Sequence, residues 1–302
     1  MREPPPNVSD DDVLTAVREH WTAEVDGVEH LPVGFGAHHW AASVRGRRTH
    51  FLTLDGLTGK HDRASLEAAY AVASGLMFPL DFVVAPVPAT GGTLTVPFAD
   101  GALSATPWIN GETPDRLDLG ETSAMLTRLH AVPAPAGLRE WAPLTPASLP
   151  EDLVALVGRP WDSGPYGERA RGALRDRLEA VAEWSETYHA LGEVARRRPW
   201  VITHGEPHER NQVVTVGKTR LVDWETVLLA PAERDWRTLV ERGLPVGELD
   251  AAMLDLFDLE WRLDEISQYA AWFSAPHAGT ASDRVAMGGL LHELTRAAFQ
   301  PG

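Results

Sequence analysis

The hydrophobic pattern of the chain changes once, near residue 106. Short apolar runs suited to β-strands come before that point, at residues 31–36, 40–44, 50–54, 83–84 and 93–97. They predict an antiparallel meander with one internal helix at residues 64–76. After that point apolar residues recur with helical spacing, as at residues 122–131 and 167–198. The pattern therefore predicts an α+β fold with a small β-rich lobe (residues 1–106) and a larger, mainly helical lobe (residues 107–302).

Composition narrows the class of protein and its partners. The formal net charge of −16 argues against a surface that binds nucleic acid or anionic lipid. Cysteine is absent, which excludes disulfides, a thiolate nucleophile and cysteine-based zinc sites. The most apolar stretch, residues 71–87, is interrupted by prolines and an aspartate and is too short to span a membrane. Residues 1–12 lack the features of a secretory signal, so we expect a cytoplasmic protein with no nucleic-acid or membrane partner.

One island of strand pattern lies within the helical part, at residues 200–225. Its first strand ends in the polar run His-Gly-Glu-Pro-His-Glu-Arg-Asn, residues 204–211, and its last strand ends in Asp223-Trp-Glu. A tight hairpin at Gly217-Lys218 would bring Asn211 and Asp223 to neighbouring strand ends. Phosphoryl transfer needs a carboxylate to orient the attacking hydroxyl and oxygen ligands for Mg²⁺ on the nucleotide phosphates. The island therefore predicts this chemistry.

At these residues the sequence resembles the aminoglycoside phosphotransferases, a protein-kinase-like family of antibiotic-modifying enzymes. The family loop reads His-Gly-Asp-x-x-x-x-Asn and is followed by an Asp-Trp-Glu-type metal loop. The resemblance is dense over residues 200–236 and extends thinly to a reduced glycine loop at residues 31–40. It implies a bilobal kinase-like fold, nucleotide bound between the lobes, and transfer of the γ-phosphoryl group of ATP or GTP to a hydroxyl of a small molecule. The expected acceptor is an antibiotic, in resistance or self-protection.

The resemblance also implies roles for single residues of the island. Glu206 would face the substrate hydroxyl, His204 would support the catalytic loop, and Asn211 and Asp223 would bind Mg²⁺. Glu206 stands where the family has Asp, and the ordinary pKa values of the two residues, about 4.3 and about 3.9, hardly differ. The extra methylene therefore changes reach, not acidity. Pro207 favours an extended backbone at Glu206.

The residues expected at the nucleotide are Gly34, Gly36, Thr53, Trp108 and Ile109. Kinase-like folds carry a phosphate-binding lysine on the third strand, with a glutamate partner on the following helix, for which Glu67 is the candidate here. Thr53 stands at the position of that lysine, and the only two lysines are elsewhere. Five residues are candidates for the cation that replaces it, namely Arg45, Arg47, Arg48, His50 and Lys60. The choice between them remains open. Trp108 and Ile109 suit a nucleotide base and a hydrophobic core equally well.

Four residues are expected at the acceptor: His208, Glu225, Asp258 and Glu265. Residues 248–265 contain seven acids and one arginine, which would suit a polycationic antibiotic. A solvated helix face explains the same charges nearly as well, and His208 fits loop support better than a substrate contact.

Other functions compete with this prediction. The run His-Gly-Glu-Pro-His suggests a metal hydrolase, but Pro207 breaks the helix that the His-Glu-x-x-His motif requires, and a deaminase would need cysteines. A nucleotide-binding protein that has lost catalysis remains open because the strand lysine is missing. So does a kinase for a metabolite such as an amino alcohol or a sugar. The sequence also leaves open whether the phosphoryl donor is ATP or GTP and whether the protein is a monomer or a homodimer.

Overall fold

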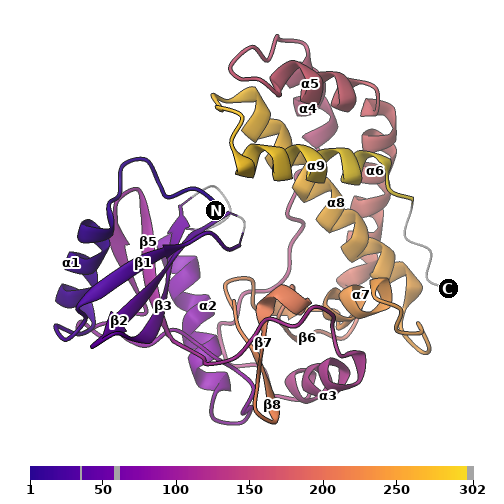
Figure 1. Cartoon of the computed structure of the whole chain (residues 1–302). Helices are drawn as coiled ribbons and strands as arrows, with labels where there is room; N and C mark the ends of the chain where they lie inside the picture. Colours follow the sequence, from indigo (N-terminus) through magenta and orange to yellow (C-terminus); the bar gives the residue numbers. More distant parts are fainter. Residues whose placement is uncertain (35, 58–61, 298–302) are drawn as a thin grey trace. The chain divides into compact units, whose positions relative to one another are not determined.

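The computed structural model describes residues 1–34, 36–57 and 62–297 (Figure 1). The chain divides into two compact units, which we describe separately. The first combines Met1–Glu140 with Val201–Leu229, and the second combines Trp141–Trp200 with the chain from Ala230 onward. The predicted catalytic island therefore belongs to the same unit as the N-terminal sheet.

The first unit is built on a five-stranded antiparallel sheet with strand order β1-β2-β3-β5-β4. Its strands are β1 (Gly27–Leu31), β2 (His38–Val44), β3 (Arg47–Gly56), β4 (Thr95–Phe98) and β5 (Gly101–Pro107). The turn between β2 and β3 consists of Arg45 and Gly46, both with positive φ, of 50° and 72°. Two such residues define the turn type that matches the twist of a hairpin. The basic turn predicted from the sequence is thus a tight hairpin.

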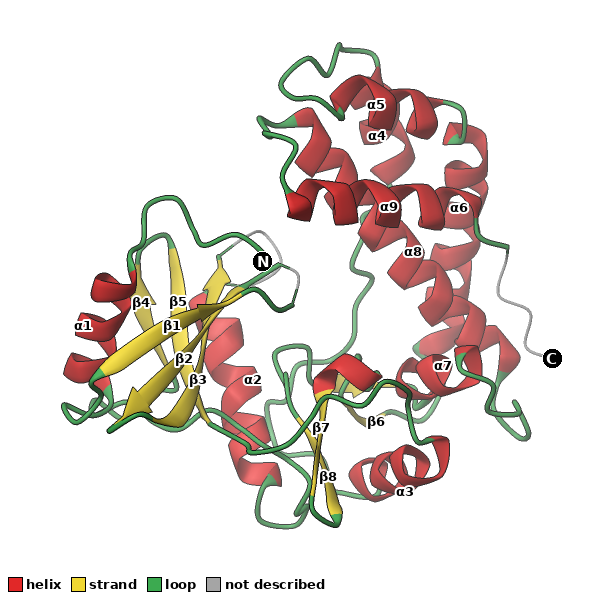
Figure 2. Ribbon diagram, viewed as in Figure 1, coloured by secondary structure: helices red, strands yellow, loops and turns green. Residues whose placement is uncertain are grey.

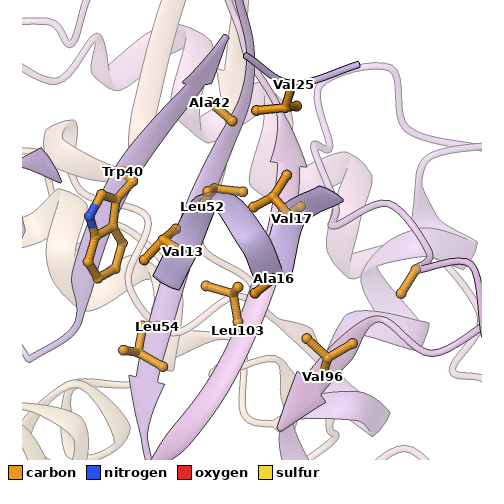
Figure 3. Close-up of a cluster of buried hydrophobic side chains, with 12 residues drawn as sticks. Val13, Ala16, Val17, Val25, Trp40, Ala42, Leu52, Leu54, Val96 and Leu103 are labelled. Carbon is orange, nitrogen blue, oxygen red and sulfur yellow. The ribbon is translucent and has the colours of Figure 1, made fainter. Parts of the chain in front are cut away.

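Each face of this sheet carries one helix (Figure 1). Helix α1 (Asp10–His20) begins with a capping box between Ser9 and Asp12 and packs on the face that contains Trp40, Leu52 and Leu103 (Figure 3). Helix α2 (Arg63–Leu76) buries Leu66 and Tyr70 against Leu94 and Ala102. Because Ala102 and Leu103 are neighbours on one strand, their side chains point to opposite faces, so α1 and α2 cover opposite sides.

The catalytic island continues the first unit with short strands (Figure 2). Its elements are β6 (Val201–Thr203), the 3-10 turn η1 (Glu209–Asn211), β7 (Gln212–Thr215), β8 (Lys218–Leu221) and β9 (Leu228–Ala230), preceded in the chain by α3 (Leu119–His130). Strands β7 and β8 form an antiparallel hairpin closed at Thr215 and Lys218, with Gly217 at a φ of 75°. Val222 N–H donates to the carbonyl of Asn211 over 3.0 Å, which brings the two strand ends together as the sequence predicts.

The described part of the second unit is helical (Figure 2). Its helices are α4 (Leu149–Val157), α5 (Gly167–Arg175), α6 (Leu178–Ala195), α7 (Glu233–Glu241), α8 (Ala251–Ser274) and α9 (Ala281–Thr295). Helix α8 is contacted by α4, α5, α6, α7 and α9 and forms the centre of this unit. Within residues 1–34, 36–57 and 62–297, none of the helices combines the length and the hydropathy needed to cross a membrane.

Candidate active site

His204 ties the catalytic loop to the metal loop. The residue follows β6 and is fully buried. Its Nε2 lies 2.9 Å from the carbonyl of Val222, and its Nδ1 lies 3.2 Å from the backbone N–H of Glu206. These partners assign a neutral ring that donates from Nε2 and accepts at Nδ1. The ring also packs edge-on against Trp224 at a centroid distance of 4.6 Å. This geometry gives His204 a supporting position.

Glu206 and Asn211 are held by the backbone of the same loop. Gly205, with a φ of 99°, turns the chain before Glu206. The Asn211 side-chain Nδ2 donates to the carbonyl of Glu206 over 3.0 Å. With its nitrogen used by the loop, Asn211 presents Oδ1 as the atom that can bind a cation. The Glu206 carboxylate is one-third exposed, and its Oε2 lies 3.6 Å from Nε2 of His208. His208 therefore stands beside the predicted catalytic carboxylate.

Asp223 presents its carboxylate from an uncommon backbone conformation. Its φ is 68°, a left-handed value that costs a residue with a Cβ roughly 1 kcal/mol and is best tolerated by Asn and Asp. The residue is solvent-exposed, yet desolvation by the surrounding protein, followed by the negative charges of Glu206 and Asp55, raises the pKa of Asp223 to about 7. A cation bound at this position would stabilise the ionised form and offset both effects.

Asp55 and Glu225 complete a cluster of carboxyl groups around Asp223. Asp55 lies near the end of β3 and is 5% exposed, and burial raises its pKa to about 6. Burial, reinforced by the charges of Asp223 and Asp55, raises the pKa of Glu225 well above its ordinary value. A hydrogen bond joins the two carboxyl groups, and it requires one proton that the pair shares. The sequence analysis did not identify Asp55. Thr53 lies two residues before it, so the two side chains share one face of β3, and this spacing was the available signal.

The glycine loop and Thr53 meet at His39. Gly34 and Gly36 have φ values of 71° and 93°, and a Cβ on Gly34 would lie 2.7 Å from Nε2 of His39. The opposite ring nitrogen of His39 lies 3.2 Å from the Thr53 hydroxyl. Desolvation, followed by the positive charge of the Met1 amino group, lowers the pKa of His39 to about 3. His39 is therefore neutral and does not supply the cation that Thr53 lacks.

Three of the basic residues considered as replacements for the strand lysine, Arg45, Arg47 and Arg48, lie in the β2–β3 turn or at the start of β3. A strand rises about 3.3 Å per residue, so Arg48 lies roughly 17 Å from Thr53 along the strand, and Arg45 and Arg47 lie further away. Arg48 pairs with Glu29 at 2.9 Å and stacks on Trp108 at 4.8 Å. Lys60 lies outside the described residues. The arginines are therefore not replacements for the lysine.

Trp108 and Ile109 directly follow β5. The backbone N–H of Trp108 donates to the carbonyl of Thr49 over 2.9 Å, and its ring lies 6.3 Å from that of Phe51. Both Trp108 and Ile109 are half-buried. Their place beside a nucleotide base stays a prediction.

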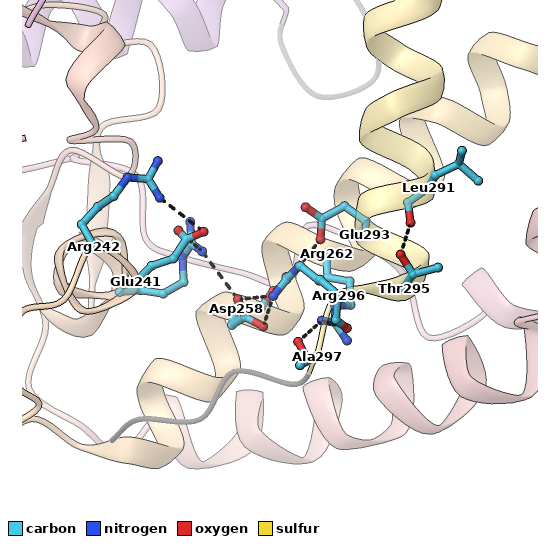
Figure 4. Close-up of polar contacts among 10 residues, drawn as sticks. Glu241, Arg242, Asp258, Arg262, Leu291, Glu293, Thr295, Arg296 and Ala297 are labelled. Carbon is cyan, nitrogen blue, oxygen red and sulfur yellow. Dashed lines mark hydrogen bonds and ion pairs between the residues drawn. The ribbon is translucent and has the colours of Figure 1, made fainter. Parts of the chain in front are cut away.

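The predicted acceptor residues fall into two groups. His208 and Glu225 lie in the catalytic island, whereas Asp258 and Glu265 lie on α8 in the second unit. Asp258 is buried, and both of its oxygens accept from Arg296 Nη1, over 2.8 and 2.9 Å (Figure 4). This buried ion pair accounts for the carboxylate, so we no longer place Asp258 at the acceptor.

Two further acids of residues 248–265 also have structural partners. Asp250 caps α8 and pairs with Arg198 at 2.5 Å. Glu260 accepts from the indole of Trp141 and the hydroxyl of Tyr188, each over 2.7 Å. The acidic stretch is therefore partly an internal framework. Glu265 is half-buried on α8, and its role at the acceptor stays a prediction.

The donor set of the island fits a nucleotide-bound Mg²⁺. In the part of the chain that the structure describes, no group of three or more His, Asp or Glu side chains is placed to hold a metal ion. Mg²⁺ on nucleotide phosphates keeps several waters and needs only about one or two carboxylates from the protein. Asn211 Oδ1 and the Asp223 carboxylate match that requirement in kind and number.

A cavity of about 270 Å³ lies elsewhere in the first unit, lined by residues of α3, the β7–β8 hairpin and the segment around Phe82. Its charged residues include Asp81, which pairs with Arg128 at 3.0 Å and with Lys218 at 3.1 Å. None of the predicted site residues lines this cavity, so it is separate from the predicted catalytic and metal-binding residues, although it shares the β7–β8 hairpin with the island.

Comparison with known proteins places the chain in a family. The model of the phosphotransferase enzyme family matches residues 61–272, and the chain belongs to this family. Protein StrN of Streptomyces griseus is 30% identical over 223 residues, which cover 67% of this chain and 68% of StrN. The enzyme class predicted from the catalytic loop, a phosphotransferase, is confirmed.

Solved structures agree in fold. A spectinomycin phosphotransferase in complex with ADP and spectinomycin superimposes with a TM-score of 0.71 at 13% identity, over 94% of both chains. An aminoglycoside phosphotransferase in ternary complex with AMP-PNP and hygromycin B gives a TM-score of 0.58 at 12% identity, over 94% of this chain and 97% of that one. A microcompartment-associated aminopropanol kinase gives 0.55 at 16% identity, over 95% of both chains. These likenesses confirm the predicted kinase-like α+β fold.

Proposed function

We propose that this enzyme transfers the γ-phosphoryl group of ATP or GTP to a hydroxyl of a small molecule, and that the acceptor is an antibiotic. The observation that carries the proposal is the joint placement of Glu206, Asn211 and Asp223 on a loop pair held together by His204. Similarity to StrN and to fold relatives solved with nucleotides and antibiotics supports it.

The proposed chemistry assigns one task to each residue. The Glu206 carboxylate accepts a hydrogen bond from the acceptor hydroxyl and aligns its oxygen with the γ-phosphorus. As the new oxygen–phosphorus bond forms, the bond from the γ-phosphorus to the bridging oxygen breaks, the nucleoside diphosphate leaves, and the hydroxyl proton passes to Glu206. Asn211 and Asp223 would hold Mg²⁺, which neutralises charge on the phosphates. His208, 3.6 Å from Glu206, helps to keep the longer carboxylate in place.

Residues 1–106 would then serve mainly the nucleotide and residues 107–302 the catalytic loop and acceptor, in a cytoplasmic enzyme with access to ATP and GTP. The deciding experiment incubates the purified chain with Mg²⁺ and ATP or GTP, together with aminoglycoside, aminocyclitol and macrolide antibiotics. Mass spectrometry detects a product heavier by one phosphoryl group. Amino alcohols and sugars form a second panel, because the fold is also shared with an aminopropanol kinase.

The same experiment distinguishes the competing functions. Phosphorylation confined to the second panel would make the chain a metabolite kinase. Thermal stabilisation by magnesium-bound nucleotide without any phosphorylated product would identify a nucleotide-binding protein that has lost catalysis.

A further inference from the structure

Kinase-like enzymes pair a lysine on the third strand with a glutamate on the following helix. In this chain the residues at these two positions make other contacts. Thr53 bonds to His39 instead of carrying a cation. Glu67, the expected glutamate partner on α2, accepts from the backbone N–H groups of Leu94 and Thr95 over 2.7 and 2.9 Å. Glu67 therefore holds the start of β4, and the expectation that it pairs toward β3 is wrong.

The contact between α2 and β3 is made one helical turn later, by Tyr70. Its hydroxyl donates to Oδ2 of Asp55 over 3.1 Å and accepts from the hydroxyl of Ser104. Asp55 is hydrogen-bonded in turn to the carboxyl group of Glu225. A continuous chain thus runs from α2 through β3 to the residue that lies two positions after Asp223.

The first two members of this chain, Tyr70 and Asp55, are attached to rigid structure. The Tyr70 ring is 4% exposed and belongs to the cluster of Leu66, Leu94 and Ala102. Asp55 is paired in register with Ala102 in the sheet. The metal loop, in contrast, passes through the left-handed φ of 68° at Asp223. An anchor at Glu225 limits the rotation of the backbone that aims the Asp223 carboxylate.

We propose that Tyr70 and Asp55 are positioning residues, and that the Tyr70–Asp55–Glu225 chain orients the metal loop for magnesium-bound nucleotide, the mechanical task that a lysine–glutamate pair performs elsewhere. The inference rests on the proposed function in one respect, namely that Asp223 binds the magnesium ion of a nucleotide. The proposed role differs from a purely structural one. Loss of a purely structural hydrogen bond would lower the stability of the fold, but it would not affect the binding of magnesium-bound and metal-free nucleotide differently.

The test uses Tyr70→Phe, which removes the hydroxyl and keeps the ring. Tyr188→Phe is the matched control, because the Tyr188 hydroxyl is buried and donates to the carboxylate of Glu260 over 2.7 Å in the second unit. Calorimetry on the full chain measures the affinity for ADP with Mg²⁺ and for ADP with a chelator, with GDP in parallel. We expect Tyr70→Phe to lower the affinity for magnesium-bound ADP about tenfold, because a hydrogen bond to a charged group is lost. The affinity for metal-free ADP should fall less than about twofold. Tyr188→Phe should change neither affinity.

Other outcomes overturn the proposal. An unchanged affinity for magnesium-bound nucleotide, an equal loss with and without Mg²⁺, or the same loss in Tyr188→Phe would each do so. A wild-type chain that binds neither magnesium-bound ADP nor GDP would refute the proposed function as well, and so the two failures are distinguishable. If Tyr70→Phe does not fold, Ser104→Ala removes only the bond that the Tyr70 hydroxyl accepts. It should cause a smaller loss that is again confined to magnesium-bound nucleotide, and a loss independent of Mg²⁺ would refute the proposal.

Discussion

Replacing Asp258 with alanine separates a structural role from a role in acceptor binding. The change removes the carboxylate that accepts two hydrogen bonds from Arg296 (Figure 4). It also removes a second ion pair, with Arg237 at 3.6 Å. Breaking a buried pair from one side typically costs about 3–5 kcal/mol. Arg296 keeps Glu293 as a partner at 2.5 Å, so we expect the lower end, a loss of about 3 kcal/mol in the free energy of unfolding.

The assay is urea unfolding followed by tryptophan fluorescence, with the free energy of unfolding obtained by linear extrapolation. Glu248→Ala in the same acidic stretch is the control, because Glu248 is exposed, and it should change stability by less than about 0.5 kcal/mol. The Michaelis constant for the acceptor provides the second measurement. A loss below about 1 kcal/mol in Asp258→Ala, accompanied by a Michaelis constant raised about tenfold, would refute the structural assignment and return Asp258 to the acceptor site.

Three further predictions concern the catalytic island. Asn211→Ala and Asp223→Ala should each lower kcat at least about 100-fold while circular dichroism shows an intact fold, because each removes a group that holds charge in the transition state; normal turnover in either variant would disprove the metal assignment. Glu206→Gln should lower kcat by about 10²–10⁴-fold, whereas Glu206→Asp should retain turnover. Equal rates for wild type and Glu206→Gln in single-turnover kinetics would contradict the role of the carboxylate. The raised pKa of Asp223, about 7, stabilises the nucleotide-free fold at acidic pH, and this contribution is lost as pH rises through 7. Asp223→Asn should therefore be more stable than wild type at pH 8 and lose that advantage toward pH 5, as measured by thermal unfolding without nucleotide; a constant difference would show that Asp223 titrates normally.

The catalytic island was predictable because its information is local. The polar run of residues 204–211 lies between two short apolar strands, and the tight β7–β8 hairpin returns the chain so that Asn211 and Asp223 meet. Turn chemistry and strand periodicity are properties of a few neighbouring residues. The glycine loop was predictable for the same reason. That a Cβ on Gly34 would collide with His39 follows only from the tertiary structure.

The surroundings of the island depended on tertiary packing. Asp55 and Tyr70 come from a strand and a helix more than a hundred residues before Glu225, and their spacing in the sequence carries no sign that the three hydrogen-bond in a chain. The sequence predicts Asp258 at the acceptor or on a solvated helix face, whereas the structure pairs it with Arg296, which directly follows α9. The sequence by itself determined the chemistry, since residue type and local geometry decide which groups can act. The tertiary structure decided which polar groups pair, because burial makes an unpaired charge costly and only the packing of distant elements supplies its partner.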